Sequence, residues 1–386
     1  MKMIREVTVY TNGDSSKIST WSNVPFLLTE TLQSQGLKVN RVNLYPRRIP
    51  EKVYNLFVDR IVRRFHPMTS YSYFRSLLHY YDVKLRVWQA VRKFKGSDAE
   101  LFLTYSFSAL GISSKPSVLF CDRTYEIYIQ QFLKRAPDSL ERKSIEREEA
   151  MVRNADTVIS LYPAVAEILR ERFPKTNVAY LGNVINCVID PPSQEIITQK
   201  RASRNILFIG GPHYIQGAEC LIEAFSLLKI KMPEIQLDIV AMDSSMFKSL
   251  PSGVTCHGYL DKSDFDGRQK YYSLLKDAKL LVNTTPMWSG FSSMIEAMYF
   301  YTPVITSLYD EFSETFGLNL NFGEYCENKP AILEEKIEKV FTTDEYEMMC
   351  LNAHDAVKDF TWSDYVRKIV GIISTLGNHN QSGGTP

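Results

Sequence analysis

The sequence lacks the features of several protein classes. No apolar run in its 386 residues approaches the ~20 residues that a membrane helix needs. The apolar run at the start of the sequence (MKMIREVTVYTNGD) is too short for a signal peptide. The six cysteines are scattered, without a Cys-x-x-Cys pair. Neither a disulfide framework nor a structural zinc site is therefore expected, and we expect a globular, cytoplasmic chain.

The chain is long enough for two domains, because it has about twice the usual single-domain length. Residues 1–185 carry 28 Lys and Arg against 18 Asp and Glu, whereas residues 186–386 carry 17 against 26. Two halves of opposite charge fit two domains with different roles, or two surfaces that complement each other across a cleft.

Both halves alternate short apolar runs with helical patterns, such as Pro163–Phe173, Ile215–Leu228 and Ser292–Phe300. Such alternation predicts doubly wound parallel sheets, so we expect an α/β chain of two Rossmann-like domains. The predicted strands are Ile4–Tyr10, Val39–Leu44, Leu101–Thr104, Val118–Cys121, Thr157–Leu161, Asn177–Leu181, Asn205–Ile209, Ile235–Ala241, Leu280–Val282 and Pro303–Thr306.

The domain boundaries follow from breaks in this pattern. Residues 1–189 and 204–361 form the two predicted domains, and a linker at 190–203 opens with Asp-Pro-Pro-Ser. A helix at about 362–376 is expected to pack back on the first domain, and 377–386 is expected to be a flexible tail. Ligands of such sheets bind beyond the carboxyl ends of the strands. Two such domains suit a reaction that joins two molecules.

Several stretches resemble a known family. The run at 204–242, RNILFIGGPHYIQGAECLIEAFSLLKIKMPEIQLDIVAM, is similar to the opening of the C-terminal domain of GT-B glycosyltransferases, above all the retaining family 4 (group 1). The stretch at 290–307, GFSSMIEAMYFYTPVITS, resembles the donor-site signature of that family. Residues 146–160 and 181–186 are similar to segments that close its N-terminal domain. The resemblance implies two Rossmann-like domains facing across a cleft, the second of which holds a nucleotide-sugar donor.

The donor-site stretch also makes physical sense by itself. Gly290 to Ser293 lack bulk and precede a helix, so their backbone N–H groups and the helix dipole can meet a diphosphate. Ser292 and Ser293 add hydroxyl donors. In the resembling family, the glutamate at the position of Glu296 holds the nucleotide ribose. Without its sequence context, Glu296 could equally be an ordinary glutamate in the first turns of a helix.

The chain departs from the family pattern at three positions. Trp288 stands where the family has a second acidic residue, Gly211 where it has an arginine, and Gln216 where it has a lysine. His213, Gln216 and the N–H groups of Gly210 and Gly211 could replace the missing contacts, although His213 could also be a solvated loop residue. The donor-side candidates are Gly210, Gly211, His213, Gln216, Tyr259, Trp288, Gly290, Phe291, Ser292, Ser293 and Glu296.

The first half supplies the acceptor-side candidates. Cys121 ends a predicted strand where the resembling family often has a histidine, and Asp122 is the nearest group that could orient a hydroxyl or act as a base. Asp122 could equally cap the helix that starts near Glu126. Asn12 and Gly13, after the first strand, lie where acceptors and diphosphates are approached in this fold.

No metal and no cofactor is expected, because the nucleotide-sugar is a substrate and the resemblance implies no required metal. Asp264-Phe265-Asp266 has the Asp-x-Asp pattern of metal-binding glycosyltransferases of another fold. It directly precedes a helical run, so we expect Asp264 to cap that helix.

The segment 41–95 is rich in cations and aromatics, with 13 Lys and Arg, three acidic residues and eleven aromatics. Two helical stripes stand out: Tyr54, Phe57, Val58, Ile61 and Phe65, then Phe74, Leu77, Leu78, Tyr81, Leu85 and Trp88. Basic residues beside such stripes indicate contact with an anionic membrane surface. The alternative is that the stripes pack on the N-terminal sheet. Nucleic acid is not an expected partner, because the second half is acidic and no recognition motif occurs.

Together these features predict a glycosyltransferase that moves a sugar from a nucleotide-sugar to a sugar or lipid-linked acceptor in polysaccharide or glycolipid biosynthesis. The resemblance implies retention of configuration, and the protein would be cytoplasmic or peripheral at the inner face of the membrane. Two alternatives stay open. One is a catalytically silent nucleotide-sugar-binding protein, and the other is a nucleotide-sugar epimerase of the same fold.

Overall fold

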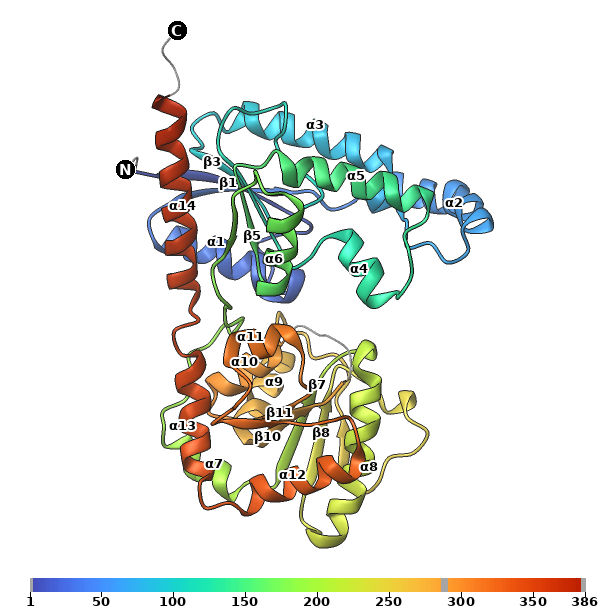
Figure 1. Cartoon of the computed structure of the whole chain (residues 1–386), viewed down its shortest axis with the longest axis vertical. Coiled ribbons are helices and arrows are strands. Elements are labelled where there is room, and N and C mark those ends of the chain that lie inside the picture. Colours follow the sequence, from blue (N-terminus) through green and yellow to red (C-terminus); the bar gives the residue numbers. More distant parts are fainter. Residues whose placement is uncertain (1–2, 286–290, 383–386) are drawn as a thin grey trace. The chain divides into compact units, whose positions relative to one another are not determined.

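The computed structural model describes residues 3–285 and 291–382, which fall into two compact units. The first comprises the chain up to Asn183 together with the segment from Trp362, and the second comprises Val184–Thr361. Each unit is built on a six-stranded parallel sheet with helices on both faces (Figure 1). The predicted α/β class and GT-B type of architecture are confirmed.

The sheet of the first unit has the strand order β2-β1-β3-β4-β5-β6, and all its neighbouring strands are parallel. Strands β3 and β5 are buried at every position, as expected for a sheet covered on both faces. The strands are β1 (Glu6–Thr11), β2 (Lys38–Asn43), β3 (Ala99–Phe102), β4 (Ser117–Cys121), β5 (Thr157–Ser160) and β6 (Val178–Tyr180).

Helices α1 and α14 lie on one face of this sheet, and α3 and α5 lie on the other (Figure 1). The phenol ring of Tyr365 in α14 packs at 5.9 Å from the ring of Phe120 in β4, so the last helix belongs to the first unit. The helices are α1 (Val24–Ser34), α2 (Arg48–Phe65), α3 (Leu77–Lys93), α4 (Tyr125–Phe132), α5 (Ser139–Arg153), α6 (Pro163–Arg172) and α14 (Trp362–Ser382).

The sheet of the second unit has the order β12-β11-β10-β7-β8-β9, again parallel. Strand β10 is buried at all six positions, and β7 lies directly beside it. The strands are β7 (Asn205–Ile209), β8 (Gln236–Val240), β9 (Val254–Cys256), β10 (Ala278–Asn283), β11 (Val304–Thr306) and β12 (Gly323–Tyr325).

Helices α8 and α12 cover one face of the second sheet, and α7, α9, α10 and α13 gather on the other (Figure 1). One apolar cluster joins the sheet to helices of both faces. The helices are α7 (Ile196–Ala202), α8 (Ile215–Lys231), α9 (Phe265–Asp277), α10 (Ser292–Tyr299), α11 (Asp310–Phe316), α12 (Pro330–Thr342) and α13 (Tyr346–Val357).

Two predicted chain segments differ from the structure. The predicted linker, 190–203, contains helix α7, because Ile196 and Ile197 are buried in the core of the second unit. The predicted flexible tail, 377–386, is helical as far as Ser382, since α14 continues through Gly377 rather than ending before it.

Helices α2 and α3 expose the predicted apolar stripes instead of packing them on the sheet. On α2, Tyr54 is buried, whereas Ile49, Val53, Leu56, Phe57, Ile61 and Phe65 are between 50% and 76% exposed. On α3, His79, Val83, Val87 and Ala90 form the buried face, so the stripe at 77–88 faces solvent. The interpretation that these stripes cover the N-terminal sheet is therefore wrong. Among the described residues, no helix is both long enough and apolar enough to cross a bilayer.

Candidate functional site

The donor-side candidates of the second unit gather where two neighbouring parallel strands end. Strand β7 runs into the turn at Gly210 and Gly211, and the adjacent strand β10 leads toward helix α10. Because parallel strands end at one edge of the sheet, both connections lie on the ligand-binding side of this fold.

Among the described residues, no side-chain hydrogen bond caps the N-terminus of helix α10 at this edge. Phe291 occupies the N-cap position and cannot cap the helix, because its side chain has no oxygen. Its ring is instead buried against the ring of Phe312, 5.4 Å away. Ser292 is exposed and Ser293 is half-buried, so the first turn offers hydroxyl and N–H donors of the kind that bind phosphate.

Glu296 lies one turn further along α10 and is buried, with 2% of its surface exposed. Lys262, from the loop after β9, places its Nζ 3.2 Å from Oε1 and 3.3 Å from Oε2 of this carboxylate. Tyr271 of α9 donates its hydroxyl to Oε2 at 2.7 Å. The carboxylate is thus held in one orientation by two groups from two other elements.

The surroundings of Glu296 are protonated groups. Burial and the neighbouring Glu296 carboxylate raise the pKa of Tyr271 well above its usual value, so its hydroxyl stays a donor. Burial and the same carboxylate raise the pKa of Cys187 well above that of a free thiol. Glu296 therefore faces a lysine, a phenol and a thiol in a largely water-excluded site.

The other donor-side candidates form the rim of this edge. A side chain at Gly210 would press against the rings of Phe208 and Tyr214, whereas Gly211 has open space around its Cα. His213 and Gln216 are exposed, and the backbone carbonyl oxygen of Gln216 accepts from the Asn328 side chain at 3.3 Å. Tyr259 is 74% exposed. Trp288 and Gly290 lie outside the described residues.

The first unit brings Cys121 and Asp122 together at the end of β4. The Cys121 thiol donates to Asp122 Oδ1 at 3.3 Å, and burial together with this carboxylate raises the thiol pKa well above its usual value. Asp122 also forms an ion pair with Arg123, with 3.1 Å between Nη2 and Oδ2. Cys121 is therefore a thiol and not a thiolate nucleophile.

Asp122 does not cap the following helix. Thr124 is the N-cap of α4 and accepts from the Ile127 N–H at 3.3 Å, whereas Asp122 accepts from the N–H of Arg123. The capping alternative for Asp122 is therefore wrong. The predicted N-cap role of Asp264 is confirmed, because its carboxylate accepts from the Gly267 N–H at 2.9 Å at the start of α9.

Asn12 and Gly13 follow β1, in the same unit as Cys121. Gly13 adopts φ 128°, a value open to glycine, and its N–H donates to Asn43 Oδ1 at 3.1 Å. The Oδ1 atom of Asn12 is buried and has no hydrogen-bond partner among the described residues. An acceptor hydroxyl could satisfy this oxygen.

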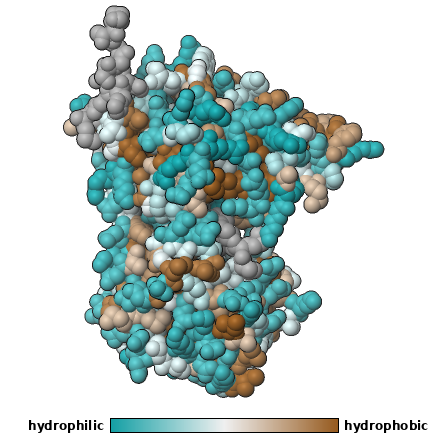
Figure 2. Space-filling model, viewed as in Figure 1, coloured by the Kyte–Doolittle hydropathy of each residue, from teal (hydrophilic) through white to brown (hydrophobic). Residues whose placement is uncertain are grey.

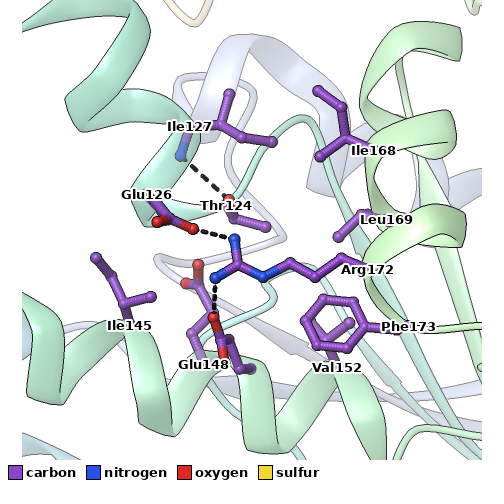
Figure 3. A pocket seen from close by; sticks show the side chains of 11 residues that line it. Thr124, Glu126, Ile127, Ile145, Glu148, Val152, Ile168, Leu169, Arg172 and Phe173 are labelled. Atoms are coloured by element: carbon purple, nitrogen blue, oxygen red, sulfur yellow. Dashed lines mark hydrogen bonds and ion pairs between the residues drawn. The ribbon is translucent and has the colours of Figure 1, made fainter. Parts of the chain in front are cut away.

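A separate hollow of about 320 Å³, open to solvent, lies between helices α4, α5 and α6 of the first unit. Figure 3 shows Arg172 of α6 reaching across it to Glu126. Arg172 also donates to Glu149 of α5. The remaining walls of the hollow are mainly apolar, and none of the predicted site residues lines it. Within residues 3–285 and 291–382, no three His, Cys, Asp or Glu side chains are grouped to hold a metal ion.

Sequence reasoning missed the two partners of Glu296. These partners are Lys262, from the loop after β9, and Tyr271 of α9. No local signal could have found them, because they lie 34 and 25 residues away from Glu296 along the chain.

The comparisons with known proteins agree with this geometry. Residues 193–354 match the family model described as "Glycosyl transferases group 1". The matched residues cover most of the second unit, Val184–Thr361. The match includes the turn at Gly210, the Lys262 loop and all of helix α10. No curated protein matches the sequence.

The whole chain shares the GT-B fold with solved glycosyltransferases. It is similar to a glycosyltransferase from Rickettsia africae (15% identity, TM-score 0.64, covering 97% of this chain and 99% of that one). WaaG, a glycosyltransferase involved in lipopolysaccharide biosynthesis, is 16% identical with a TM-score of 0.63 and coverage of 96% and 99%. Sucrose-phosphate synthase from Thermosynechococcus elongatus is 15% identical with a TM-score of 0.62 and coverage of 98% of both chains.

Proposed function

We propose that this protein transfers a sugar from a nucleotide-sugar, held by the second unit, to a sugar or lipid-linked acceptor. The observation that carries the proposal is Glu296, a buried and oriented carboxylate one turn behind the N-terminus of α10. A carboxylate can accept hydrogen bonds from both ribose hydroxyls, and a helix N-terminus binds phosphate. The two features lie on one helix in the order that a nucleoside diphosphate requires.

The chemistry in this proposal consists of positioning and charge stabilisation. Cys121 is held as a thiol, and Asp122 is paired with Arg123, so neither is placed as a dedicated nucleophile. The resemblance to the retaining group 1 family supports transfer with retention, and without a dedicated nucleophile the leaving diphosphate would help to deprotonate the acceptor. The Gly210–Gly211 turn and the first turn of α10 would receive the negative charge that develops on that diphosphate, and no metal is required.

The solved relatives support a nucleotide-sugar donor and a surface-glycan pathway. HepE from Anabaena, 13% identical with a TM-score of 0.60 and coverage of 96% and 100%, was solved in complex with UDP and glucose. WaaG acts in lipopolysaccharide biosynthesis. We extend these properties to this chain as proposals, with an acceptor from polysaccharide or glycolipid biosynthesis.

A lipid-linked acceptor would be met at a membrane, and α2 with α3 offers a matching surface. Figure 2 shows hydrophobic side chains exposed at the end of the first unit where Figure 1 places α2. Exposed cations flank them, among them Arg48, Lys52, Arg60 and Arg64. Arg47, just before α2, pairs with Asp82 of α3 at 3.3 Å, which ties the two helices together. We propose that this surface lies on an anionic leaflet at the inner face of the membrane.

The test of the reaction uses the full-length protein with UDP-, GDP-, dTDP- and ADP-sugars. A thermal-shift screen selects the donor, and NMR then follows the sugar with and without lipid and glycan acceptors and with EDTA. A transferase forms a new anomeric signal with retained coupling only when an acceptor is present, with or without EDTA. Conversion of the donor alone would indicate an epimerase, and binding without turnover would indicate a silent binding protein.

A further inference from the structure

Glu296 has a partner whose position is unexpected for a ribose-binding carboxylate. The ammonium of Lys262 contacts both carboxylate oxygens and lies 4.5 Å from the centre of the Tyr271 ring. The lysine side chain is more accessible than the carboxylate, because 15% of it is exposed against 3% for Glu296.

The backbone that carries Lys262 is fixed, while its side chain ends in a single ion pair. Asp261 accepts from the Ser263 N–H at 2.8 Å, and Arg268 of α9 donates to the Lys262 carbonyl oxygen at 3.4 Å. A lysine ammonium is a point charge on a flexible four-carbon stem. Such a group can change partner by rotating its side chain without moving its loop.

A nucleoside diphosphate needs positive charge at this site, and the rim supplies little. Gly211 has no side chain and Gln216 is neutral, although both lie beside the edge where the diphosphate would bind. Lys262 is the cation that the described residues place on Glu296. Glu296 is four residues from Ser292, about 6 Å along the helix axis, so the lysine contacts a residue just over one helical turn from the N-terminal end of α10.

We propose that Lys262 is the diphosphate-binding cation of this protein and covers Glu296 while the donor site is empty. When ribose hydroxyls donate to Glu296, the ammonium moves from the carboxylate to the phosphate oxygens of the donor. This inference rests on the proposed function and names the residue that recognises the charged part of its substrate.

The experiment measures binding of a nucleoside diphosphate and of its nucleoside by calorimetry in the full-length protein. The diphosphate used is whichever of UDP, GDP, dTDP and ADP binds the wild type most tightly. The nucleoside used is the one that corresponds to this diphosphate. Lys262→Met removes the charge and keeps an unbranched stem, and Lys262→Arg restores a cation. Lys270→Met, at an exposed position on α9, is the matched control.

We expect Lys262→Met to weaken binding of the diphosphate by roughly ten- to a hundredfold, the range of a charge-assisted hydrogen bond. Nucleoside binding should stay the same or tighten, because the ammonium no longer covers Glu296. Lys262→Arg should recover most of the diphosphate affinity, and Lys270→Met should change neither value. Thermal melting verifies that each variant is folded.

Two results would overturn the inference while the proposed function stands. An equal loss for diphosphate and nucleoside would mean that Lys262 only orients Glu296, and no loss for either would mean that Lys262 does not serve the site. If the wild type binds none of the four diphosphates, the proposed function and this inference are both rejected.

Discussion

Tyr271 donates a hydrogen bond of 2.7 Å to Glu296, and both side chains are buried in the second unit. The bond joins α9 to α10 and fixes the carboxylate at the edge where β7 and β10 end. Since the phenol stays protonated, it is a permanent donor to Glu296 rather than a competing base.

Replacing Tyr271 by Phe removes this donor and leaves the ring. A hydrogen bond to a charged group contributes about 1.5–3 kcal/mol, so the free energy of unfolding should fall by that amount in urea titrations. Tyr259→Phe is the control, because Tyr259 is exposed, and should change stability by less than about 0.5 kcal/mol. Equal stability of Tyr271→Phe and wild type would contradict the contact.

Close packing around Gly217, in the first turn of α8, can be tested by substitution. A Cβ at this position would lie 2.8 Å from the backbone nitrogen of Thr285, which cannot move aside like a side-chain end. We expect Gly217→Ala to destabilise the protein by about 1–3 kcal/mol, although alanine favours helix. Gly211→Ala meets no atom within 4 Å and should be tolerated. Thermal denaturation distinguishes the two, and an unchanged Tm for Gly217→Ala would refute the close approach.

The contacts of Glu141 predict that the protein loses part of its stability in acid. Burial raises the pKa of Glu141, but hydrogen bonds from Arg135, the Asp138 N–H and Ser70 outweigh burial and lower it to about 2. A carboxyl group with a depressed pKa stabilises the fold at pH values above the pKa that it has in the unfolded chain, near 4.3. This contribution is lost as the pH falls toward the folded-state pKa of about 2.

The stability difference between wild type and Glu141→Gln should therefore shrink by about 2 kcal/mol between pH 6 and pH 3. Guanidinium titrations at the two pH values measure it. If the difference is the same at both, Glu141 does not titrate as its contacts indicate.

The membrane proposal makes a prediction about two kinds of side chain on α2. The double variant Phe57→Ser and Phe65→Ser removes apolar contacts with the membrane. The double variant Arg60→Gln and Arg64→Gln removes two exposed cations, each of which contributes roughly 1 kcal/mol to the binding free energy at an anionic surface. Both double variants should co-sediment less with phosphatidylglycerol vesicles at low salt. The control is Ile230→Ser, an equally exposed apolar residue on α8 of the second unit. Similar pelleting with neutral vesicles, or at high salt, would argue against an anionic surface.

The sequence allowed the two sheets to be predicted because their long strands are apolar runs between helical patterns. Strands β9 and β12 were missed, since neither Val254–Cys256 nor Gly323–Tyr325 is an apolar run and β9 is largely accessible. Periodicity located α2 and α3 but could not show which side each helix buries. On α3 both faces carry apolar residues, and the face with Val83 and Val87 is the one that packs.

The site was predictable only where it is local in sequence. The Ser292–Glu296 stretch could be recognised from its own residues, whereas the Lys262 and Tyr271 contacts depend on how α9 and the loop before it fold onto α10. Asp122 shows the same limit, because a carboxylate is visible in the sequence but its ion pair with Arg123 is not.

The most direct test of the account is calorimetric titration of Glu296→Ala with the nucleoside diphosphate that binds the wild type. Loss of the carboxylate should weaken binding by about 1.5–3 kcal/mol, which is roughly ten- to more than a hundredfold, in a protein that remains folded. Glu335→Gln, at an exposed position on α12, should bind like the wild type. Unchanged affinity in folded Glu296→Ala would contradict the claim that this residue holds the donor.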